Sequence, residues 1–363
     1  MSVNPVSISD LDTFIRKLPK AELHLHLEGT IEPSTLVELS EQVDRGADAA
    51  PMTLDEAEKL YQYTDFSGFL LAFKAVCARL KGPAEYELAA WRMLEKLAAQ
   101  GVVHAEVYIS VGVVYFWRKV EDAANPRLFE EIFEGLERAR VRGERELGVT
   151  LYWIYDAVRH FSLAEAERVF RLAVKLKEEF PSIIGIGLGG DERVAASEPF
   201  RAIYAEAKAA GLRLTNHAGE TTGPEAIWEA LSVGSERLGH VVSAGRDAAL
   251  VEELRAKRIP LELNPSSNVR TGVCAGWEEH PLRRYFDAGL FVTLNSDDPA
   301  FFGSTLENEY RLAAEVQGFT RAELAELAAN SFRASFLPDS DKERWVKRVA
   351  NFATSAAVST FES

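Results

Sequence analysis

Two histidines separated by one residue, His24 and His26, are the side chains best suited by type and spacing to do chemistry. In a β-strand, side chains alternate, so both imidazoles point to one face and converge on a single point. Imidazole is the commonest metal ligand in proteins, and Gly29 follows in a loop that a substrate can reach. The pair indicates half of a metal site, with hydrogen-bonded polar histidines as the alternative.

The elements that position these residues are predicted by short β-rich runs that alternate with amphipathic helical stretches. The runs predict strands at 22–27, 102–109, 149–155, 183–188, 213–217, 237–241, 261–264 and 291–295. The helices between them are expected at 33–44, 127–147, 163–180, 198–210, 224–233, 247–257 and 281–288. Parallel strands joined by helical crossovers predict an α/β fold, a (β/α)8 TIM barrel with extra C-terminal helices. A doubly wound open sheet is the alternative.

The chain shows no repeat, low-complexity tract or Gly/Ser/Pro-rich linker that would divide it, so one domain spanning residues 1–363 is expected. Residues 45–100, between the first and second predicted strands, have a mostly helical pattern. We interpret this segment as a helical insertion near the open end of the barrel, where it would act as a lid.

Composition limits the class of protein. The net charge is −15, from 41 basic and 56 acidic residues, which disfavours a nucleic-acid or anionic-membrane partner. No apolar run is long enough to cross a membrane, and the N-terminus lacks a secretion signal. The two cysteines, Cys77 and Cys274, form no metal-type motif or disulfide framework. A cytoplasmic protein with a small neutral or cationic substrate is expected.

The remaining polar candidates fall at the ends of predicted strands. His217 ends the fifth strand, His240 lies in the sixth, and Asp297 follows the eighth. In a TIM barrel, these positions share one rim with the first strand, so the side chains should face one cavity. His104, His160 and His280 lack this alignment and are expected to be surface or hydrogen-bonded core residues, while Arg237 is expected to pair with a buried carboxylate.

These residues lie in motifs whose order resembles that of adenosine and adenine deaminases. The motifs are PKAELHLH at 19–26, NHAGE at 216–220, RLGH at 237–240, NPSSNV at 264–269 and NSDDP at 295–299. The resemblance runs from about residue 18 to residue 302. Each motif alone is weak evidence, but together and in this order they are highly specific.

The resemblance implies one Zn²⁺ per chain, held by His24, His26, His217 and Asp297. Zinc lowers the pKa of a bound water to about 7, which makes hydroxide available at neutral pH. A second metal is not expected, because the fourth strand, 183–190, contains no lysine to bridge two ions.

The resemblance also implies the other roles at the site. His240 would orient or deprotonate the attacking water, together with Asp297, and Glu220 would donate a proton to ring nitrogen N1 of a 6-aminopurine. Glu220 must be protonated for that step, so we expect its pKa to be raised. Asp298 would hold purine N7, and the backbone N–H of Gly190 would reach N3.

The motifs divide over the substrate. Glu28 stands where adenosine deaminases generally carry aspartate, and Glu28 and residues 295–303 look more like adenine deaminases. Residues 267–272 look more like bacterial adenosine deaminases. The first interpretation is deamination of adenosine, with adenine or a 5′-modified adenosine such as aminodeoxyfutalosine as alternatives. The oligomeric state is not predicted.

Readings outside this reaction remain. A zinc amidohydrolase of a cyclic amide would use the same histidines without needing Glu220 as an acid. A binding protein without activity would be expected to have lost a ligand, and all four are present. Taken singly, Asp297-Asp298-Pro299 is also typical of a helix start, Gly189-Gly190 of a turn, and Glu220 of a solvated loop.

Overall fold

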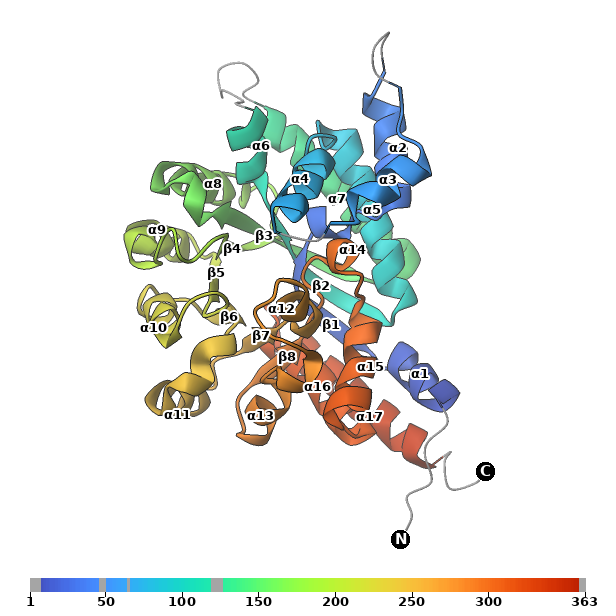
Figure 1. Ribbon diagram of the computed structural model, residues 1–363, viewed down its shortest axis with the longest axis vertical. Helices are drawn as coiled ribbons and strands as arrows, with labels where there is room; N and C mark the ends of the chain where they lie inside the picture. The colour runs from blue at the N-terminus through green and yellow to red at the C-terminus, as the bar shows by residue number, and fades with distance from the viewer. Residues whose placement is uncertain (1–7, 46–49, 64–65, 119–126, 359–363) are drawn as a thin grey trace.

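Eight parallel strands follow one another in chain order around a barrel, with helices on its outside (Figure 1). The computed structural model describes residues 8–45, 50–63, 66–118 and 127–358. The strands are β1 (Lys20–His26), β2 (Val102–Ile109), β3 (Thr150–Val158), β4 (Ile183–Gly189), β5 (Arg213–Ala218), β6 (Arg237–His240), β7 (Leu261–Leu263) and β8 (Val292–Leu294). The TIM-barrel prediction is confirmed, and every predicted strand coincides with an observed one.

The barrel closes between β1 and the segment that follows β8. The backbone N–H of Asp297 donates to His24 O at 3.1 Å, and the N–H of His26 donates to Asp297 O at 3.0 Å. Leu25 and Asp297 form a parallel bridge at the same place. The side chain of Asn295 extends this seam by accepting from the N–H of Leu23 at 3.0 Å. The first and last strands are thus joined where the predicted ligands lie.

The connection from β1 to β2 is helical. It contains the short helix η1 (Glu28–Thr30), α2 (Pro33–Val43), α3 (Leu54–Leu60), α4 (Phe66–Cys77) and α5 (Pro83–Ala99). A capping box between Thr53 and Glu56 begins α3, and α5 packs lengthwise against α7 (Leu128–Leu147). That residues 45–100 act as a lid stays a prediction, as does the single-domain assignment.

Helices also follow the other strands, and their apolar faces explain why they cover the barrel. In α8 (Leu163–Leu176), for example, the buried residues Ala166, Val169, Phe170 and Ala173 recur at helical spacing. The remaining helices of this layer are α6 (Val111–Arg118), α9 (Arg201–Ala209), α10 (Pro224–Ser232), α11 (Ala248–Ala256), α12 (Pro265–Arg270), α13 (Leu282–Asp287), α14 (Pro299–Phe302) and α15 (Leu306–Gln317).

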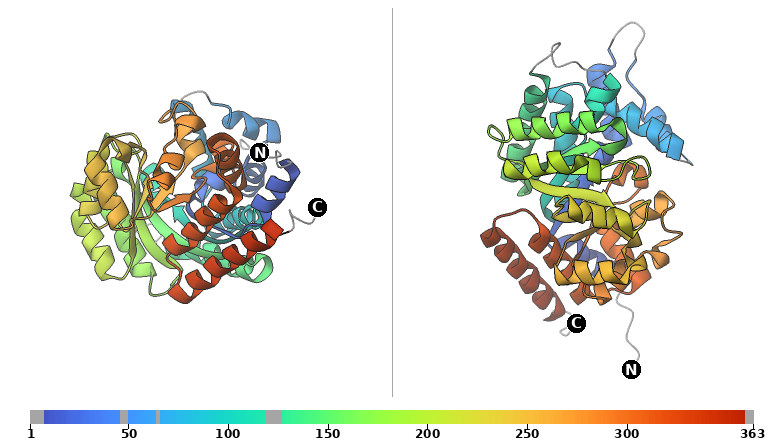
Figure 2. Two further views of the ribbon diagram at one scale, coloured as in Figure 1. Left: turned by 90° about the horizontal axis from the view of Figure 1, so that it is seen from below. Right: turned by 90° about the vertical axis from the view of Figure 1, so that its left-hand side faces the viewer.

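The predicted C-terminal helices are present as α16 (Arg321–Ala334) and α17 (Asp339–Val358), and α1 (Ile8–Lys17) precedes the first strand. Figure 2 shows α17 as a long helix on the outside of the molecule, where it packs against α16. In the part of the chain that the structure describes, no helix is both long and apolar enough to span a bilayer.

A buried ionic network crosses the interior of the barrel. Arg237 on β6 forms ion pairs with Glu106 on β2 and Glu262 on β7, and all three side chains are at most 1% exposed. Burial alone would raise the pKa of Glu106, but the Arg237 guanidinium lowers it to about 2. Arg237 therefore pairs with buried carboxylates, as the sequence predicted, and ties three strands together.

Replacing the guanidinium should cost far more stability than removing a surface charge. We expect Arg237→Met to lower the free energy of unfolding by about 3–5 kcal/mol, because two buried carboxylates lose their counter-ion. Arg171→Met is the control: Arg171 lies on the surface of α8 with its side chain 56% exposed, and its loss should cost less than about 1 kcal/mol. Urea denaturation measures both free energies of unfolding. Equal losses in the two variants would contradict the stabilising role of the buried Arg237 network.

Candidate active site

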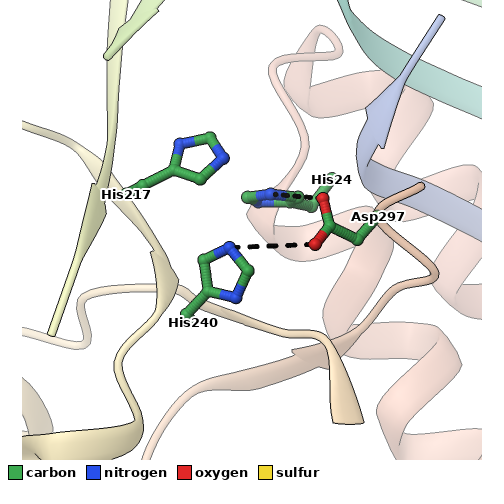
Figure 3. A group of neighbouring side chains, drawn as sticks. All are labelled: His24, His217, His240 and Asp297. Atoms are coloured by element: carbon green, nitrogen blue, oxygen red, sulfur yellow. Dashed lines mark ion pairs between the residues drawn. The ribbon is translucent and has the colours of Figure 1, made fainter. Parts of the chain in front are cut away.

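A cluster of buried imidazoles and one carboxylate lies at the closing seam of the barrel. His24, His217, His240 and Asp297 each offer one ligand atom, and these atoms lie within 4.8 Å of one another (Figure 3). His26 Nε2 adds to the group, 3.2 Å from His217 Nε2 and 3.4 Å from Asp297 Oδ1. The structure therefore brings the four predicted ligands together with His240.

The strands explain how these residues meet. His24 and His26 are two residues apart on β1, so their side chains lie on the same face of this fully buried strand. His217 and His240 lie at the ends of β5 and β6, which are paired neighbours in the sheet. His240 and Asp297 both have a φ of 65°, in the left-handed region that non-glycine residues rarely adopt. Such strained backbone concentrates at functional sites, where it aims side chains that a regular strand would direct elsewhere.

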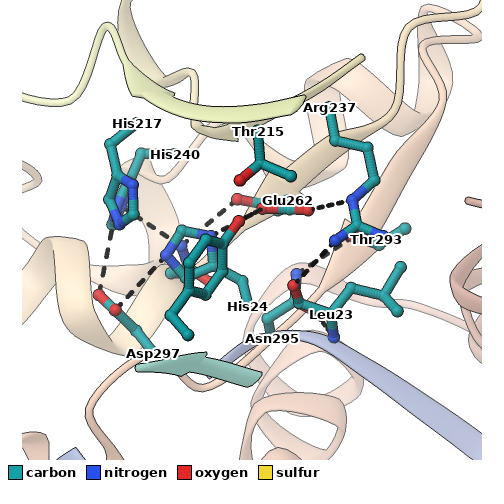
Figure 4. Close-up of polar contacts among 12 residues, drawn as sticks. Leu23, His24, Thr215, His217, Arg237, His240, Glu262, Thr293, Asn295 and Asp297 are labelled. Atoms are coloured by element: carbon teal, nitrogen blue, oxygen red, sulfur yellow. Dashed lines mark hydrogen bonds and ion pairs between the residues drawn. The ribbon is translucent and has the colours of Figure 1, made fainter. Parts of the chain in front are cut away.

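Neighbouring polar groups fix the orientation of the cluster (Figure 4). His24 Nδ1 lies 2.8 Å from Glu262 Oε2, which also accepts from the hydroxyl of Tyr108. The hydroxyl of Ser267 donates to Asp297 Oδ2 at 2.6 Å. With Nδ1 directed at Glu262, the other ring nitrogen of His24, Nε2, faces Asp297 Oδ1, 3.5 Å away.

This donor set fits a metal ion. His24 Nε2 is buried and has no hydrogen-bond partner among the described residues. Burial alone would lower the pKa of His24, but Asp297 and Glu262 raise it to about 10, so the pair favours a positive charge between this nitrogen and the carboxylate, which a proton or a metal ion can supply. A buried polar atom left unpaired costs about 1–3 kcal/mol. Three imidazoles and one carboxylate are also the ligand types that divalent transition metals prefer.

Glu220 follows β5 and lies beside His240. Its Oε1 is 3.8 Å from His240 Nδ1, and its side chain is 18% exposed. Burial, together with the negative charges of Asp297 and Glu192, raises the pKa of Glu220 to about 8. The direction is the one expected from the sequence, and it keeps a proton on this carboxyl at neutral pH.

Glu192, which sequence reasoning missed, holds the loop that carries Glu220. Its Oε1 accepts from the N–H of Glu220 at 3.4 Å, and its Oε2 accepts from the N–H of Thr221 at 3.3 Å. The hydroxyl of Thr222 donates to the same Oε2 at 2.6 Å. The only available signal was its position two residues after Gly190, in the loop that ends β4.

Three further buried carboxyls near the cluster keep an oxygen without a hydrogen-bond partner among the described residues: Glu28 Oε2, Asp156 Oδ1 and Asp298 Oδ1. Burial raises the pKa of Glu28 to about 7 and that of Asp156 to about 8. Burial, Asp297 and Glu28 together raise the pKa of Asp298. Protonated or anionic, such groups are prepared to bind polar edges of a ligand.

Two glycines near these groups lie where a side chain would collide with a neighbour. A Cβ on Gly29 would lie 1.9 Å from Asp298 Oδ1, so only glycine lets this carboxyl lie against η1. Gly190 has a φ of +87°, and a Cβ there would lie 2.8 Å from His160 Nδ1. The neighbour that a side chain at Gly190 would meet is His160, and the predicted approach of a purine to the N–H of Gly190 stays a prediction.

The other histidines are placed as expected. His104 is buried and hydrogen-bonded to Thr150 and Glu106, whereas His160 is exposed and accepts from the N–H of Asp191. His280 is a hydrogen-bonded core residue, but its partner, Asn268, is also bonded to His240.

Known proteins resemble this chain over nearly its whole length. A sequence model of the family described as adenosine deaminase matches residues 19–352. The aminodeoxyfutalosine deaminase of Streptomyces avermitilis is 37% identical over 337 residues, which cover 92% of this chain and 91% of that protein. The adenine deaminase of Geotalea uraniireducens is 35% identical over 357 residues, which cover 98% of this chain and 97% of that protein. A crystal structure of an adenine deaminase from Arthrobacter aurescens is 33% identical with a TM-score of 0.83, and covers 93% of this chain and 99% of that one.

Metal binding by this cluster should be measurable as stability. After treatment with a chelator, added Zn²⁺ should raise the melting temperature, because an ion at about 1,000 times its dissociation constant stabilises the folded state by about 4 kcal/mol. The variant His217→Ala should lose this rise, and the exposed control His160→Ala should keep it. Differential scanning calorimetry makes the comparison; an unchanged rise in His217→Ala would place the ion elsewhere.

Proposed function

This chain belongs to the adenosine deaminase family and is a hydrolase acting on C–N bonds, and we propose that it removes the 6-amino group of adenine. The observation that carries the proposal is the position of the Glu220 carboxyl, 3.8 Å from His240 and beside the imidazole and carboxylate cluster, where burial raises its pKa to about 8. An acid held next to a water-activating centre is what hydrolysis at C6 of a purine requires.

Zinc is the metal we propose, held by His24, His26, His217 and Asp297. When bound, zinc lowers the pKa of a coordinated water to about 7 and so supplies a nucleophile at neutral pH. Glu262 fixes the ring of His24, and Ser267 fixes the carboxylate of Asp297. These contacts orient the ligands before any ion arrives, which lowers the cost of forming the site.

The protons of the reaction can be followed through the residues of the site. The oxygen of water forms a bond to C6, and the bond from C6 to the amino nitrogen breaks. Of the two protons that water brings, one ends on ring N1 and the other leaves with ammonia. Glu220 delivers the N1 proton, which prevents negative charge from building up on the ring during attack. His240 and Asp297 contact the attacking water from the other side.

The unpartnered carboxyl oxygens suit the far edge of the purine. With C6 at the cluster and N1 at Glu220, the N7 edge of the purine faces Asp298. Because the pKa of Asp298 is raised, its carboxyl is protonated and donates a hydrogen bond to N7. The N3 edge faces the backbone N–H of Gly190. Nitrogen N9 lies between N7 and N3, on the side of the ring farthest from C6, and we assign it to Glu28.

Glu28 is the reason for preferring adenine to adenosine. Free adenine carries a hydrogen on its imidazole ring, and when this hydrogen is on N9 it needs an acceptor. Glu28 Oε1 already accepts from the N–H of Ser110 at 3.0 Å, which leaves the unpartnered Oε2 to accept from N9–H. The sequence alone favoured adenosine as the substrate. The similarity to the adenine deaminases of G. uraniireducens and A. aurescens fits adenine, the alternative, better.

A 5′-modified adenosine is the second candidate, and aromatic side chains favour it. Phe161 follows β3, Trp117 lies in α6 after β2, and Phe73 lies in α4, which packs against η1 at the end of β1. All three therefore belong to the C-terminal face of the barrel. Trp117 contacts both Phe73 and Phe161, with ring centroids 6.3 and 6.0 Å apart. This aromatic surface suits a planar substituent, and the relative from S. avermitilis is named for such a substrate.

Removing the acid tests the reaction class. We expect Glu220→Gln to lower ammonia release from adenine by about 10²–10⁴-fold while metal content stays unchanged. In the native enzyme, kcat/KM should fall as pH rises through about 8, because Glu220 then loses the proton it must donate. Activity that survives in Glu220→Gln would favour the cyclic-amide hydrolase instead.

Changing the acceptor tests the substrate. In Glu28→Gln, the amide oxygen stays with the N–H of Ser110, so an NH₂ group replaces Oε2 and faces N9–H, donor against donor. We expect kcat/KM for adenine to fall about tenfold or more, while a nucleoside, whose hydroxyls also accept, loses less. Glu32→Gln is the control, because Glu32 is a partly exposed partner of Lys96. If Glu28→Gln lowers kcat/KM more for 5′-modified adenosines than for adenine, the 5′-modified adenosine is the substrate.

A further inference from the structure

A chain of buried hydrogen bonds runs behind His240, away from the metal ligands. His240 Nδ1 lies 3.0 Å from the side-chain nitrogen of Asn268, and Asn268 Oδ1 lies 3.2 Å from His280 Nε2. At the far end, the backbone N–H of Leu282 donates to His280 Nδ1 at 3.2 Å. None of the three side chains is more than 3% exposed.

The direction of every bond in this chain follows from its last member. A backbone N–H can only donate, so His280 Nδ1 is an acceptor and carries no proton. Burial and the nearby His240 lower the pKa of His280 to about 3, so the neutral ring carries its single proton on Nε2. That proton is donated to Asn268 Oδ1. The amide of Asn268 then presents its N–H to His240 Nδ1.

His240 Nδ1 is consequently the acceptor at the near end of the chain. The side-chain nitrogen of Asn264 lies 3.4 Å from the same atom and presents a second N–H to it, whereas Glu220 Oε1, at 3.8 Å, lies beyond hydrogen-bond distance. A neutral imidazole with an acceptor at Nδ1 carries its proton on Nε2. This nitrogen faces the cluster, 4.0 Å from Asp297 Oδ2.

We propose that Asn268 and His280 are positioning residues that hold His240 with its proton on Nε2, so that His240 acts on the attacking water as a hydrogen-bond donor. The role of His240 toward water rests on the proposed deamination, whereas the position of its proton does not. Orientation through a neighbouring group is how enzymes commonly select one imidazole nitrogen for chemistry. Here an amide replaces the more familiar carboxylate, and the amide selects the opposite tautomer.

The variant Asn268→Asp distinguishes two roles of His240 toward water, hydrogen-bond donor and general base. A carboxylate only accepts, so it draws the proton of His240 to Nδ1 and leaves Nε2 without one. If His240 must donate, kcat should fall about 10²-fold, as when one donor to a developing oxyanion is removed. The KM and the metal content should stay the same. If His240 is a base, the same change should maintain or raise kcat, and this outcome overturns the donor role.

The position of the proton can be read directly. In enzyme labelled with ¹⁵N-histidine, we expect the His240 signals of the native chain to show a protonated Nε2 and a bare Nδ1, and those of Asn268→Asp to show the reverse. A protonated Nδ1 in the native chain overturns the proposal whether or not the enzyme deaminates adenine. Failure of all 6-aminopurines as substrates, with the expected signals, would reject the proposed function and the donor role but not the tautomer.

Two changes at His280 complete the test. Gln can place an N–H where His280 has Nε2, so His280→Gln should keep kcat within a few-fold of the native value. His280→Leu has no donor and should lose kcat and give mixed ¹⁵N signals for His240. Equal kcat values in the two variants would reject a positioning role. Asn308→Asp, a matched change on α15, controls for added charge, and melting temperatures show whether each variant is folded.

Discussion

The joining of β1 to the segment after β8 is the interaction on which the rest of the structure depends. Asp297 takes part twice, because its backbone bonds to His24 and His26 while its carboxylate faces their imidazoles. Closure of the barrel and assembly of the cluster are therefore one event. A chain that failed to close here would leave the histidines of β1 without their carboxylate, and the β-sheet with an open edge.

Closure also brings acidic groups into the barrel, and only some of them are paired with a cationic side chain. Below the cluster, the positive charge of Arg237 is shared by Glu106 and Glu262, so these carboxylates are stable as anions. Above it, the described residues offer Glu28 and Asp298 no such cation, and burial raises their pKa values instead. Unsatisfied groups of this kind reduce stability, and proteins retain them where binding or chemistry needs them.

The sequence predicted the barrel because parallel strands and amphipathic helices leave separate periodic signals along the chain. It also predicted the cluster, because the ends of the strands must meet at one rim. It could not identify residues whose importance depends on a neighbour across the barrel. The predicted third strand ended at residue 155, so Asp156 was missed, although β3 continues to Val158. His280 was predicted to be a core residue, which is correct, yet only the fold places it behind Asn268.

The two ends of the site differ in how they are built, and this explains why the reaction class is easier to infer than the substrate. The reacting end is made by residues in the strands or directly after them, whose positions the barrel geometry fixes. The far end is made by segments that leave the strands, including Glu28 in η1 and Trp117 in α6. Such segments can change without disturbing the barrel, and the similar proteins include both an aminodeoxyfutalosine deaminase and an adenine deaminase. The proposed preference for adenine therefore rests on the acceptor atom that Glu28 carries in η1.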